Sequence, residues 1–345
     1  RITLDSPILR VASAYEHRLR CKGVPGARWN PALKQWEYPS RPEIAAALLR
    51  AFDGVPVMLD EGSAGLVKAH EEGQAGAARA KQSDAADLPP IPLVKTAPWR
   101  HQLRGFHYLM SLLDNHGGAA CLFMAMGTGK SKTLLDVIIN KGFRRALVVC
   151  PLSVVTVWPK EVERHAAAPF YVCCLQDGSV TKRAQALQGA IAAADALKRP
   201  LLAICNYQAF WREPLADAIL DGEFDCIIYD EGHMLKSPSG VASHFAARLA
   251  KQIPYRVAST GTPASHSPDD LYGLYRAIDA LWALGVSSHA EFKAKYMILG
   301  GYGRHETVGW RDLKDLHRRM YSIAFRVEAK EALPDLPEAI HIERR

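Results

Sequence analysis

The sequence feature that most restricts the fold of this chain is a glycine-rich stretch that directly follows an apolar run. Residues 124–133 read MAMGTGKSKT; the apolar run 119–123 precedes them, and apolar residues at helical spacing follow. Gly127 and Gly129 allow backbone N–H groups to approach phosphate oxygens closely, and the N-terminus of the following helix adds partial positive charge. Strand, tight loop and helix in this order predict a phosphate-binding loop in an α/β fold.

The individual loop residues have distinct expected roles in binding a nucleoside triphosphate. Lys130 would neutralise the β- and γ-phosphates, and the Ser131 hydroxyl would ligate Mg²⁺. The other loop residues assigned to the nucleotide are Met126, Gly127, Thr128, Gly129 and Lys132. A full match to the general pattern would place glycine at position 124, where this chain has Met124. Taken alone, the stretch is therefore also compatible with a chance turn before a helix.

A second motif, an acidic pair, ends another apolar run further along the chain. Asp230 and Glu231 follow the run 226–229, so their carboxylates would project from the carboxyl edge of a sheet, where nucleotides bind in open α/β folds. Asp230 is expected to hold Mg²⁺ through water, and Glu231 to orient or deprotonate the attacking water. An isolated pair of this kind is also common at a helix N-cap. With a phosphate loop upstream, the two motifs together predict ATP and Mg²⁺ as ligands.

Composition adds limits on location and partners. The 345 residues suffice for two domains, and 48% hydrophobic with 23% charged residues is ordinary for a globular protein. No apolar stretch is long enough to cross a bilayer and the amino terminus lacks a signal-like order, so we expect an intracellular protein, cytoplasmic or in a eukaryote nuclear, without a membrane partner. The chain begins at Arg1, which suggests processing or truncation. The net charge of +7 weakly favours a polyanionic partner.

The chain divides at a change of composition. Residues 60–95 are rich in alanine, glycine, charged residues and finally proline, which suits an exposed linker that is partly helical. A small module, 1–59, therefore precedes a large one, 96–345. In the large module, β-like runs alternate with longer helical stretches, and this alternation predicts a mainly parallel sheet covered by helices. The runs are 119–123, 146–150, 201–205, 226–229 and 256–259.

From residue 98 onward, the order of motifs resembles the Swi/Snf-type branch of superfamily 2 helicase-like ATPases. Each block alone is weak, but five in the family's order are not expected by chance. The Thr-Gly-Thr-Pro form of the last block separates the chain from the RNA helicases that carry Ser-Ala-Thr there. The blocks are WRHQLRG (99–105), the phosphate loop, ALVVCPLS (146–153) with Trp158, DEGH (230–233) followed by Lys236, and STGTP (259–263).

The resemblance implies a RecA-like fold and further roles for residues in these blocks. In the first block, the amide of Gln102 would recognise adenine through donor and acceptor together, with Arg100 beside it. His233, Thr260 and Thr262 would relay the state of the γ-phosphate to the DNA-bound surface. Contacts to nucleic acid are assigned to Ser153, Trp158, Asn206 and Lys236, although Asn206 suits a buried polar turn equally well.

Two departures from the family pattern leave the expected ligands in place. Gly232 stands where the family usually has alanine, and Met124-Ala125 stands where it often has an acidic pair. The ATPase part of the family's members has two RecA-like lobes, and this chain is expected to contain only the first. FRV (325–327) and LPDLP (333–337) resemble the segment that leads out of the first lobe. Since a missing arginine finger lowers phosphoryl transfer by roughly 10³ to 10⁵, we expect the fragment to bind ATP but hydrolyse it poorly.

The small module resembles the HepA-related (HARP) module of annealing helicases. The similarity rests on ILRV (8–11), VPGARWN (24–30), QWEYP (35–39) and an amphipathic stretch, 44–52. Such a module would bind forked or single-stranded DNA, with Arg28, Trp29 and Trp36 combining phosphate attraction and base stacking. Alternatively, the tryptophans form the core of a very small domain, where large aromatic side chains are needed for burial.

Together these patterns predict an ATP-driven translocase acting on double-stranded or forked DNA, in remodelling, repair or strand annealing. Two alternatives remain open. The first is an RNA helicase or the motor of a restriction system, which shares the engine but differs in substrate. The second is a non-catalytic, nucleotide-gated DNA-binding module. The basic series between residues 293 and 326 is interleaved with acids and is interpreted as a solvated helical face.

Overall fold

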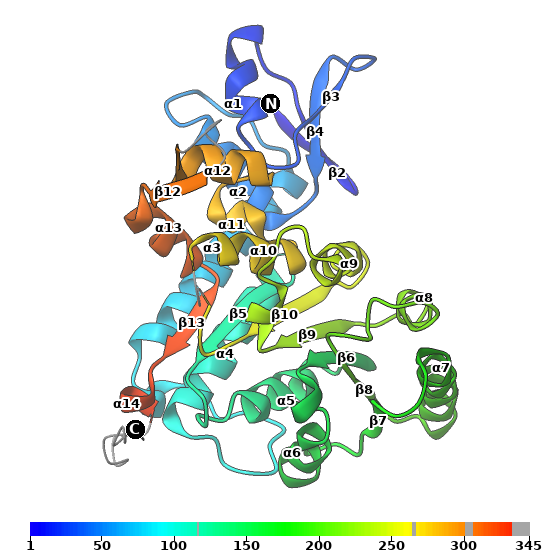
Figure 1. Ribbon diagram of the computed structural model, residues 1–345. Coiled ribbons are helices and arrows are strands. Elements are labelled where there is room, and N and C mark those ends of the chain that lie inside the picture. The colour runs from blue at the N-terminus through cyan, green and yellow to red at the C-terminus, as the bar shows by residue number, and fades with distance from the viewer. Residues whose placement is uncertain (116, 264–266, 301–305, 333–345) are drawn as a thin grey trace.

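The computed structural model describes residues 1–115, 117–263, 267–300 and 306–332 (Figure 1). The stretch 333–337, expected to lead out of the lobe, lies outside these ranges. Within them, no helix combines the length and apolar character needed to cross a membrane.

A seven-stranded parallel sheet forms the centre of the large module, which confirms the predicted fold class. Its strand order is β13-β5-β10-β9-β6-β8-β7, and every pairing is parallel. The strands are β5 (Ala119–Met124), β6 (Arg145–Cys150), β7 (Tyr171–Leu175), β8 (Leu201–Asn206), β9 (Cys226–Asp230), β10 (Tyr255–Ser259) and β13 (Ala324–Val327).

Two of these strands were not predicted, and both lie at the edges of the sheet. The five predicted strands are almost entirely buried, which makes them continuous apolar runs. In contrast, β7 is only half-buried, and β13 is a four-residue strand with an exposed arginine. Both strands are short and pair with a neighbouring strand on one side only, so their apolar sequence pattern is weaker than that of the central strands.

Helices flank this sheet and contact one another in series: α4 with α5, α5 with α6, α7 with α8, and α9 with α10. Their apolar faces and the strands share one hydrophobic core. The helices are α4 (Arg100–Asn115), α5 (Lys130–Asn140), α6 (Val157–His165), α7 (Val180–Leu197), α8 (Leu215–Leu220), α9 (Val241–Leu249) and α10 (Asp269–Ala277).

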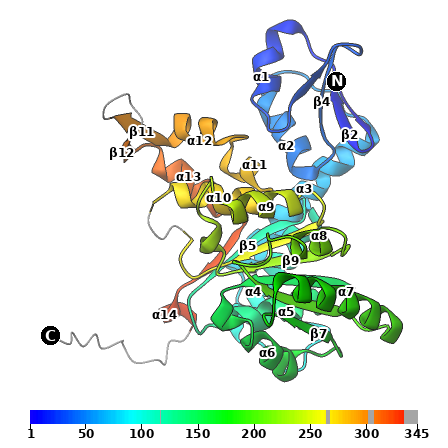
Figure 2. The same ribbon diagram turned by 45° about the vertical axis from the view of Figure 1, so that its right-hand side comes forward.

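The amino-terminal part has its own antiparallel sheet and its own hydrophobic cluster, set apart from the large sheet in Figure 2. The strand order is β1-β2-β4-β3, and two helices accompany it. The elements are β1 (Ile2–Asp5), β2 (Ile8–Val11), α1 (Arg18–Lys22), β3 (Arg28–Asn30), β4 (Gln35–Pro39) and α2 (Pro42–Ala51).

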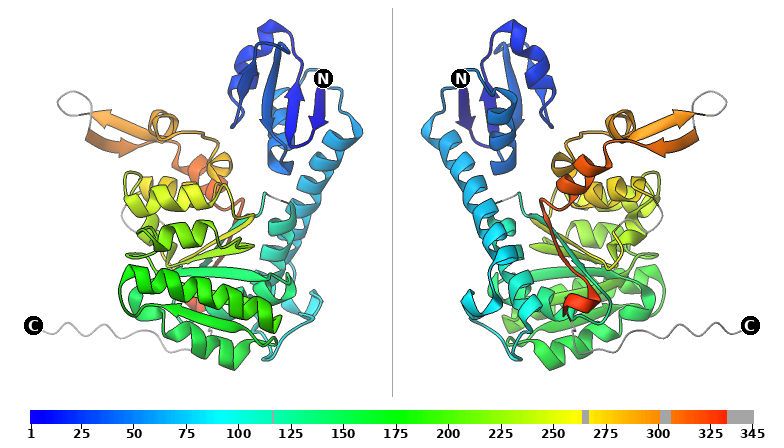
Figure 3. Two further views of the ribbon diagram at one scale, coloured as in Figure 1. Left: turned by 90° about the vertical axis from the view of Figure 1, so that its right-hand side faces the viewer. Right: turned by 90° about the vertical axis from the view of Figure 1, so that its left-hand side faces the viewer.

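The segment expected to be an exposed linker is mostly one helix, α3 (Glu61–Gln82), visible in Figure 3 as the long helix between the two parts. Asp60 caps it by accepting a hydrogen bond from the backbone N–H of Ser63 at 2.8 Å. Its second half packs against α4, and Ala77 and Ala80 belong to the core of the large module. Gly76 allows this close packing, because a Cβ there would lie 2.6 Å from the Ser111 hydroxyl.

Between β10 and β13 the chain forms a peripheral group of short elements. Asp315 is the centre of an ion-pair cluster there, with Lys295, Arg318 and Arg319 at 3.6, 2.5 and 2.7 Å. These cations therefore belong to an internally paired, solvated face, in agreement with the interpretation of the basic series. The elements are α11 (Leu281–Leu284), α12 (His289–Tyr296), β11 (Met297–Gly300), β12 (Glu306–Trp310) and α13 (Leu313–Met320), with α14 (Ala329–Ala332) after β13.

A polar contact and an apolar one join the two parts of the chain. Arg41 and Asp279 form an ion pair of 2.6 Å, and the partly buried Trp282 packs against both hydrophobic clusters. Beside them, the Glu43 carboxyl is completely buried, and burial raises its pKa to about 7 despite the opposing charges of Arg41 and Arg256. A titratable group is thus enclosed at the junction.

Replacing Glu43 with glutamine is expected to change how stability depends on pH. The pKa of Glu43 is near 4.5 in the unfolded chain and about 7 in the folded chain, so the folded state binds more protons between these values. The contribution of Glu43 to the free energy of unfolding is therefore lost as pH rises from about 4.5 to 7. The free energy of unfolding of Glu43→Gln minus that of wild type, measured with urea, should therefore be roughly 1–3 kcal/mol more favourable to the variant at pH 8 than at pH 5. An equal difference between the two proteins at both pH values would contradict this assignment.

Candidate functional site

The phosphate loop and the acidic pair meet at the carboxyl edge of the sheet. The loop follows β5, Asp230 ends β9, and β10 lies between these two strands. In the register of the sheet, Ser259 of β10 pairs with Leu122 on one side and with Asp230 on the other. Parallel strands bring their carboxyl ends to one edge, so motifs far apart in sequence converge there (Figure 1).

The loop has the backbone conformation for which its glycines are needed. Gly127 and Gly129 have φ values of +78° and +82°, in the left-handed region that disfavours other residues. A Cβ at Gly129 would also lie 2.1 Å from Nε2 of Gln102. Thr128 is buried, and its hydroxyl donates to the Ala125 carbonyl at 2.7 Å. The loop is therefore closed on itself ahead of α5, with Ser131 partly buried in its first turn and Met126 exposed.

The Lys130 ammonium lies inside the loop and faces the acidic pair. Its Nζ donates to the carbonyl oxygens of Met124 at 3.2 Å and Ala125 at 3.4 Å, and lies 3.5 Å from Oε1 of Glu231. Met124 is the buried last residue of β5 and contributes its carbonyl oxygen to this contact. A main-chain contact of this kind does not require glycine, which explains why the pattern tolerates methionine at this position.

Asp230 is held by two donors from neighbouring segments. Nε1 of Trp158 donates to Oδ2 of Asp230 at 3.2 Å, and the Tyr207 hydroxyl donates to its main-chain carbonyl at 2.9 Å. Burial and the charge of Glu231 raise the pKa of Asp230, and Lys130 and the Trp158 hydrogen bond oppose the shift, which leaves the pKa at about 6. The carboxylate is therefore buried, with the charge of Lys130 only partly offsetting the effect of burial.

Glu231 begins a short polar chain. Its backbone is left-handed, with φ of +51°, and its Oε2 accepts from the Thr260 hydroxyl at 3.3 Å. Nδ1 of His233 lies 3.0 Å from that hydroxyl and 3.3 Å from Oε2. The backbone N–H of Thr262 donates to the same hydroxyl at 3.1 Å. Of the three residues expected to couple nucleotide state to movement, His233 and Thr262 therefore both contact Thr260, which contacts Glu231.

The glycine that replaces the family's alanine has a local packing reason. A Cβ at Gly232 would lie 2.8 Å from Cδ1 of Leu274, a buried residue of α10. Such a separation is shorter than van der Waals contact allows, so the glycine accommodates the leucine. Neither carboxylate is displaced by this departure.

The Gln102 amide is also built into the loop. Nε2 of Gln102 donates to the Thr128 carbonyl at 3.1 Å, and Oε1 of Gln102 accepts from the backbone N–H of Trp99 at 2.9 Å. Nε2 of His101 lies 2.8 Å from the same Thr128 oxygen. Next to the Gln102 amide is a cavity of about 600 Å³. Sequence patterns missed Asp84 and Glu331, which line the cavity from two segments outside the 99–105 block and join Trp99, Arg100 and His101 there. Arg100 is largely exposed and 3.9 Å from Asp84.

One residue assigned to the nucleotide and three assigned to nucleic acid are buried in the structure, which argues against those roles. Lys132 forms a buried 2.5 Å ion pair with Asp136 one turn further along α5, so its charge is already neutralised within the protein. Trp158 is completely buried against Asp230. Asn206 is buried and accepts from Arg183 at 3.4 Å, which favours the polar-turn interpretation. Trp36 is a core residue of the small module.

Other residues assigned to nucleic acid are accessible. Ser153 and Arg28 are exposed, and Lys236 is partly exposed. Trp29 is half exposed, with its ring 5.3 Å from that of Trp36. The two explanations for the tryptophans therefore divide between the two rings, one in the core and one at the surface.

Comparisons with known proteins agree with this architecture. The family described as SNF2-related domain matches residues 101–325, more than half of the chain. A DNA repair and recombination protein RAD54-like from Drosophila yakuba is 25% identical over 232 residues, covering 64% of this chain and 29% of that protein. A SWI/SNF-related matrix-associated actin-dependent regulator of chromatin subfamily A-like protein 1 homolog from Caenorhabditis elegans is 26% identical over 325 residues, covering 92% of this chain and 43% of that protein.

Among solved structures, the fold is similar to the Sulfolobus solfataricus SWI2/SNF2 ATPase core in complex with dsDNA. The TM-score is 0.56 at 23% identity, covering 73% of this chain and 49% of that one. The chain thus spans less than half the length of each of these three proteins. The family match includes the phosphate loop, the acidic pair and the Thr260 cluster that the sheet brings together. This chain belongs to the SNF2-related family.

Proposed function

We propose that this chain is the nucleotide-binding part of an ATP-driven motor that moves along double-stranded or forked DNA. The observation that carries the proposal is the convergence of Lys130, Asp230 and Glu231, with Thr260 in contact, at one sheet edge. The relatives point to DNA: one is named as a DNA repair and recombination protein, and the Sulfolobus ATPase core is in complex with dsDNA.

The residues at this edge fit ATP with Mg²⁺. Lys130 is positioned inside the loop, where phosphate oxygens would take the place of the two carbonyl oxygens that it now contacts. The Ser131 hydroxyl and the Asp230 carboxylate are the hard oxygen donors that Mg²⁺ prefers. Burial and the charge of Glu231 raise the pKa of Asp230, and a cation bound there would favour its ionised form. When bound, the cation would neutralise charge on the phosphates. The cavity beside Gln102, lined by Trp99 and Arg100, would hold the adenine.

The remaining roles follow from contacts at the site. Glu231 would orient the attacking water, and its hydrogen bond with Thr260 would pass a change at the phosphates to His233 and Thr262. We assign residues 1–59 to a HARP-like DNA-binding module, 60–95 to the connection, and 96–345 to the ATP-binding lobe. Exposed Arg28 and Trp29 would contact DNA from the module, and Ser153 and Lys236 from the lobe. Arginines from a second lobe would complete the site.

Replacing Trp158 with phenylalanine is expected to weaken Mg²⁺-ATP binding in a pH-dependent manner. The change removes the hydrogen bond that favours the ionised Asp230, so its pKa should rise above about 6. The protonated carboxyl does not ligate Mg²⁺, so affinity should fall several-fold at pH 6.5 and much less at pH 8.5, measured by calorimetry. Affinity for duplex DNA should be unchanged, because Trp158 is buried. An equal loss of nucleotide affinity at both pH values would contradict the role given to this hydrogen bond.

The proposal is tested by the ATPase rate of this chain and of any longer gene product that contains it. Each is assayed without nucleic acid, and with duplex DNA, forked DNA or RNA, at one fixed salt concentration because binding to nucleic acid depends on salt. Stimulation by duplex or forked DNA is expected in the form that has a complete site. Stimulation by RNA alone would favour an RNA helicase. ATP binding without stimulation by any nucleic acid would overturn the motor and favour a nucleotide-gated binding module.

A further inference from the structure

A second cavity, of about 700 Å³, lies at the opposite edge of the sheet from the phosphate loop. Its lining comes from the residues directly before three strands: Phe143 and Arg144 before β6, Phe170 before β7, and Lys198 to Pro200 before β8. The carboxyl ends of α5 and α7, Ala168 and Leu93 contribute the rest of the lining. A volume of this size falls within the range of ligand-binding sites. The nucleotide chemistry uses none of these residues.

Backbone hydrogen bonds and paired side chains hold the walls of this cavity in place. The N–H of Leu201 donates to the Arg144 carbonyl and the N–H of Tyr171 to the Pro200 carbonyl, both at 2.8 Å, which ties the three pre-strand segments together. The Asn140 side chain accepts from the N–H of Leu93 and donates to its carbonyl, both at 3.0 Å. The cavity is therefore preformed, and a ligand would bind without first ordering its walls.

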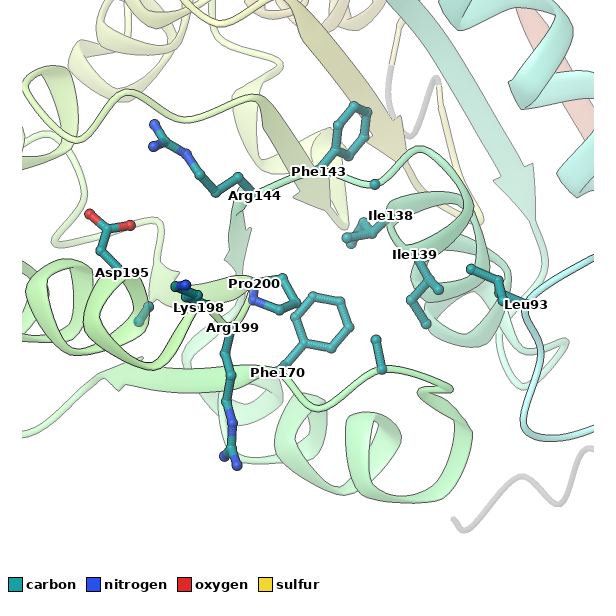
Figure 4. Close-up of a pocket in the computed structure, with 13 residues that line it drawn as sticks. Leu93, Ile138, Ile139, Phe143, Arg144, Phe170, Asp195, Lys198, Arg199 and Pro200 are labelled. Carbon is teal, nitrogen blue, oxygen red and sulfur yellow. The ribbon is translucent and has the colours of Figure 1, made fainter.

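The cavity has an apolar side and a charged side. Figure 4 shows Ile138, Ile139 and Leu93 on one side and Arg144, Asp195 and Lys198 on the other. The Phe143 ring is buried with its centroid 4.8 Å from that of Tyr255, and Leu93 is about half exposed. An aliphatic or aromatic side chain entering here would bury apolar surface on both partners.

Positive charge predominates on the charged side. Asp195, the lining carboxylate, is 2.7 Å from Arg145, so its charge is already neutralised. Arg144 lies 3.4 Å from Glu223, and both side chains of that pair are largely solvated. Lys198 and Arg199 are exposed and have no ion pair within the described part of the chain. The rim therefore carries unneutralised cations next to an apolar floor.

We propose that this cavity binds a short acidic segment of a partner protein. One aliphatic or aromatic side chain of the segment would enter between Ile139, Phe143 and Phe170, and flanking carboxylates would lie against Lys198 and Arg199. Nucleic acid fits less well, because Leu93, Ile138 and Ile139 on the apolar side offer no contact to a phosphate backbone. A partner bound here would leave the nucleotide edge of the sheet free.

Selection of random peptides displayed on phage against the whole chain tests this inference. Selected peptides are synthesised, and their Kd values are measured by fluorescence anisotropy against wild type and variants. We expect peptides that combine Asp or Glu with Phe, Leu or Ile. The charge variant K198E/R199E and the floor variant Phe170→Ala should each raise Kd at least about tenfold. Lys182→Glu changes an exposed cation near the start of α7, away from the lining and from Lys198, which follows the end of that helix. It is the matched control and should change Kd by less than about twofold.

Three outcomes would overturn the inference: no peptide is enriched, the enriched peptides bind both variants as well as wild type, or duplex DNA displaces the peptide and itself loses affinity for K198E/R199E. The last result would assign the surface to nucleic acid. Both substituted residues of the charge variant are exposed, so folding is expected to persist, and melting temperature verifies this. Higher salt should weaken binding through the cations. No readout uses ATP hydrolysis, so the result is independent of the proposed motor function.

Discussion

ATP hydrolysis is expected to fall by about 10² to 10⁴ when Glu231 is replaced by glutamine, while ATP remains bound. The substitution keeps the size of the side chain and its hydrogen bond with Thr260, but removes the carboxylate that can take up a proton from water. It also removes the negative charge 3.5 Å from Lys130, so the lysine remains available for phosphate. The rate is measured with duplex DNA in a form whose site is complete, and ATP affinity by calorimetry.

Two further variants make this result specific. Glu72→Gln changes an exposed carboxylate of α3 that forms only a surface ion pair with Lys68 at 3.7 Å, and should leave the rate unchanged. Lys130→Ala should instead abolish ATP binding, because it removes the charge inside the phosphate loop. A Glu231→Gln protein that hydrolyses ATP within a few-fold of wild type would refute the role of Glu231. Loss of binding together with hydrolysis would show that Glu231 mainly holds the nucleotide.

Gly118→Ala is expected to destabilise the folded chain by about 4 kcal/mol or more. Gly118 precedes β5 and has φ of +72°, and its carbonyl oxygen accepts a hydrogen bond from the backbone N–H of Arg256 at 2.7 Å. A Cβ there would lie 1.9 Å from the main-chain carbonyl oxygen of Pro254, a separation that only backbone movement can relieve. Movement would separate the start of β5 from β10, which are paired in the middle of the sheet. Urea unfolding measures the loss.

Gly142→Ala is the matched control for this prediction. Gly142 also has a left-handed backbone, with φ of +65°, but a Cβ there would meet no atom within 4 Å. Its expected cost is that of the left-handed conformation alone, about 1–2 kcal/mol. The difference between the two variants therefore measures the steric conflict with Pro254. Equal losses of stability in the two variants would mean that the Pro254 segment moves aside at little cost. The left-handed backbone conformation alone would then account for the destabilisation.

Several parts of the site depend on contacts that no local pattern contains. Lys132 follows Ser131 in the loop motif, yet its charge is neutralised by Asp136. Trp158 occurs in a block expected to contact nucleic acid, yet it is buried against Asp230. In both cases the motif predicted the role of a residue from its position in the sequence, but burial in the folded chain determined which atoms its side chain contacts.

The alanine-rich stretch before the large module illustrates the same limit. Its composition suits either a solvated connection or a helix that packs closely on another helix, because small residues serve both. The partner decides between them: α4 offers Ser111 and apolar neighbours, and α3 packs there with Ala77 and Ala80 in the core. The cavity beside Gln102 likewise required Asp84, Trp99 and Glu331 to be brought together from separate segments.

The sequence by itself determined the phosphate loop, the acidic pair, the Thr260 block and the parallel sheet that brings them to one edge. Those features depend on backbone conformation over a few residues and on the periodicity of apolar side chains, both of which are local. Only the tertiary structure decided which polar side chains are buried, that α3 packs on α4, and that a basic-rimmed apolar cavity forms at the far edge. Burial, pKa and cavities arise where distant segments meet, so they depend on the whole fold.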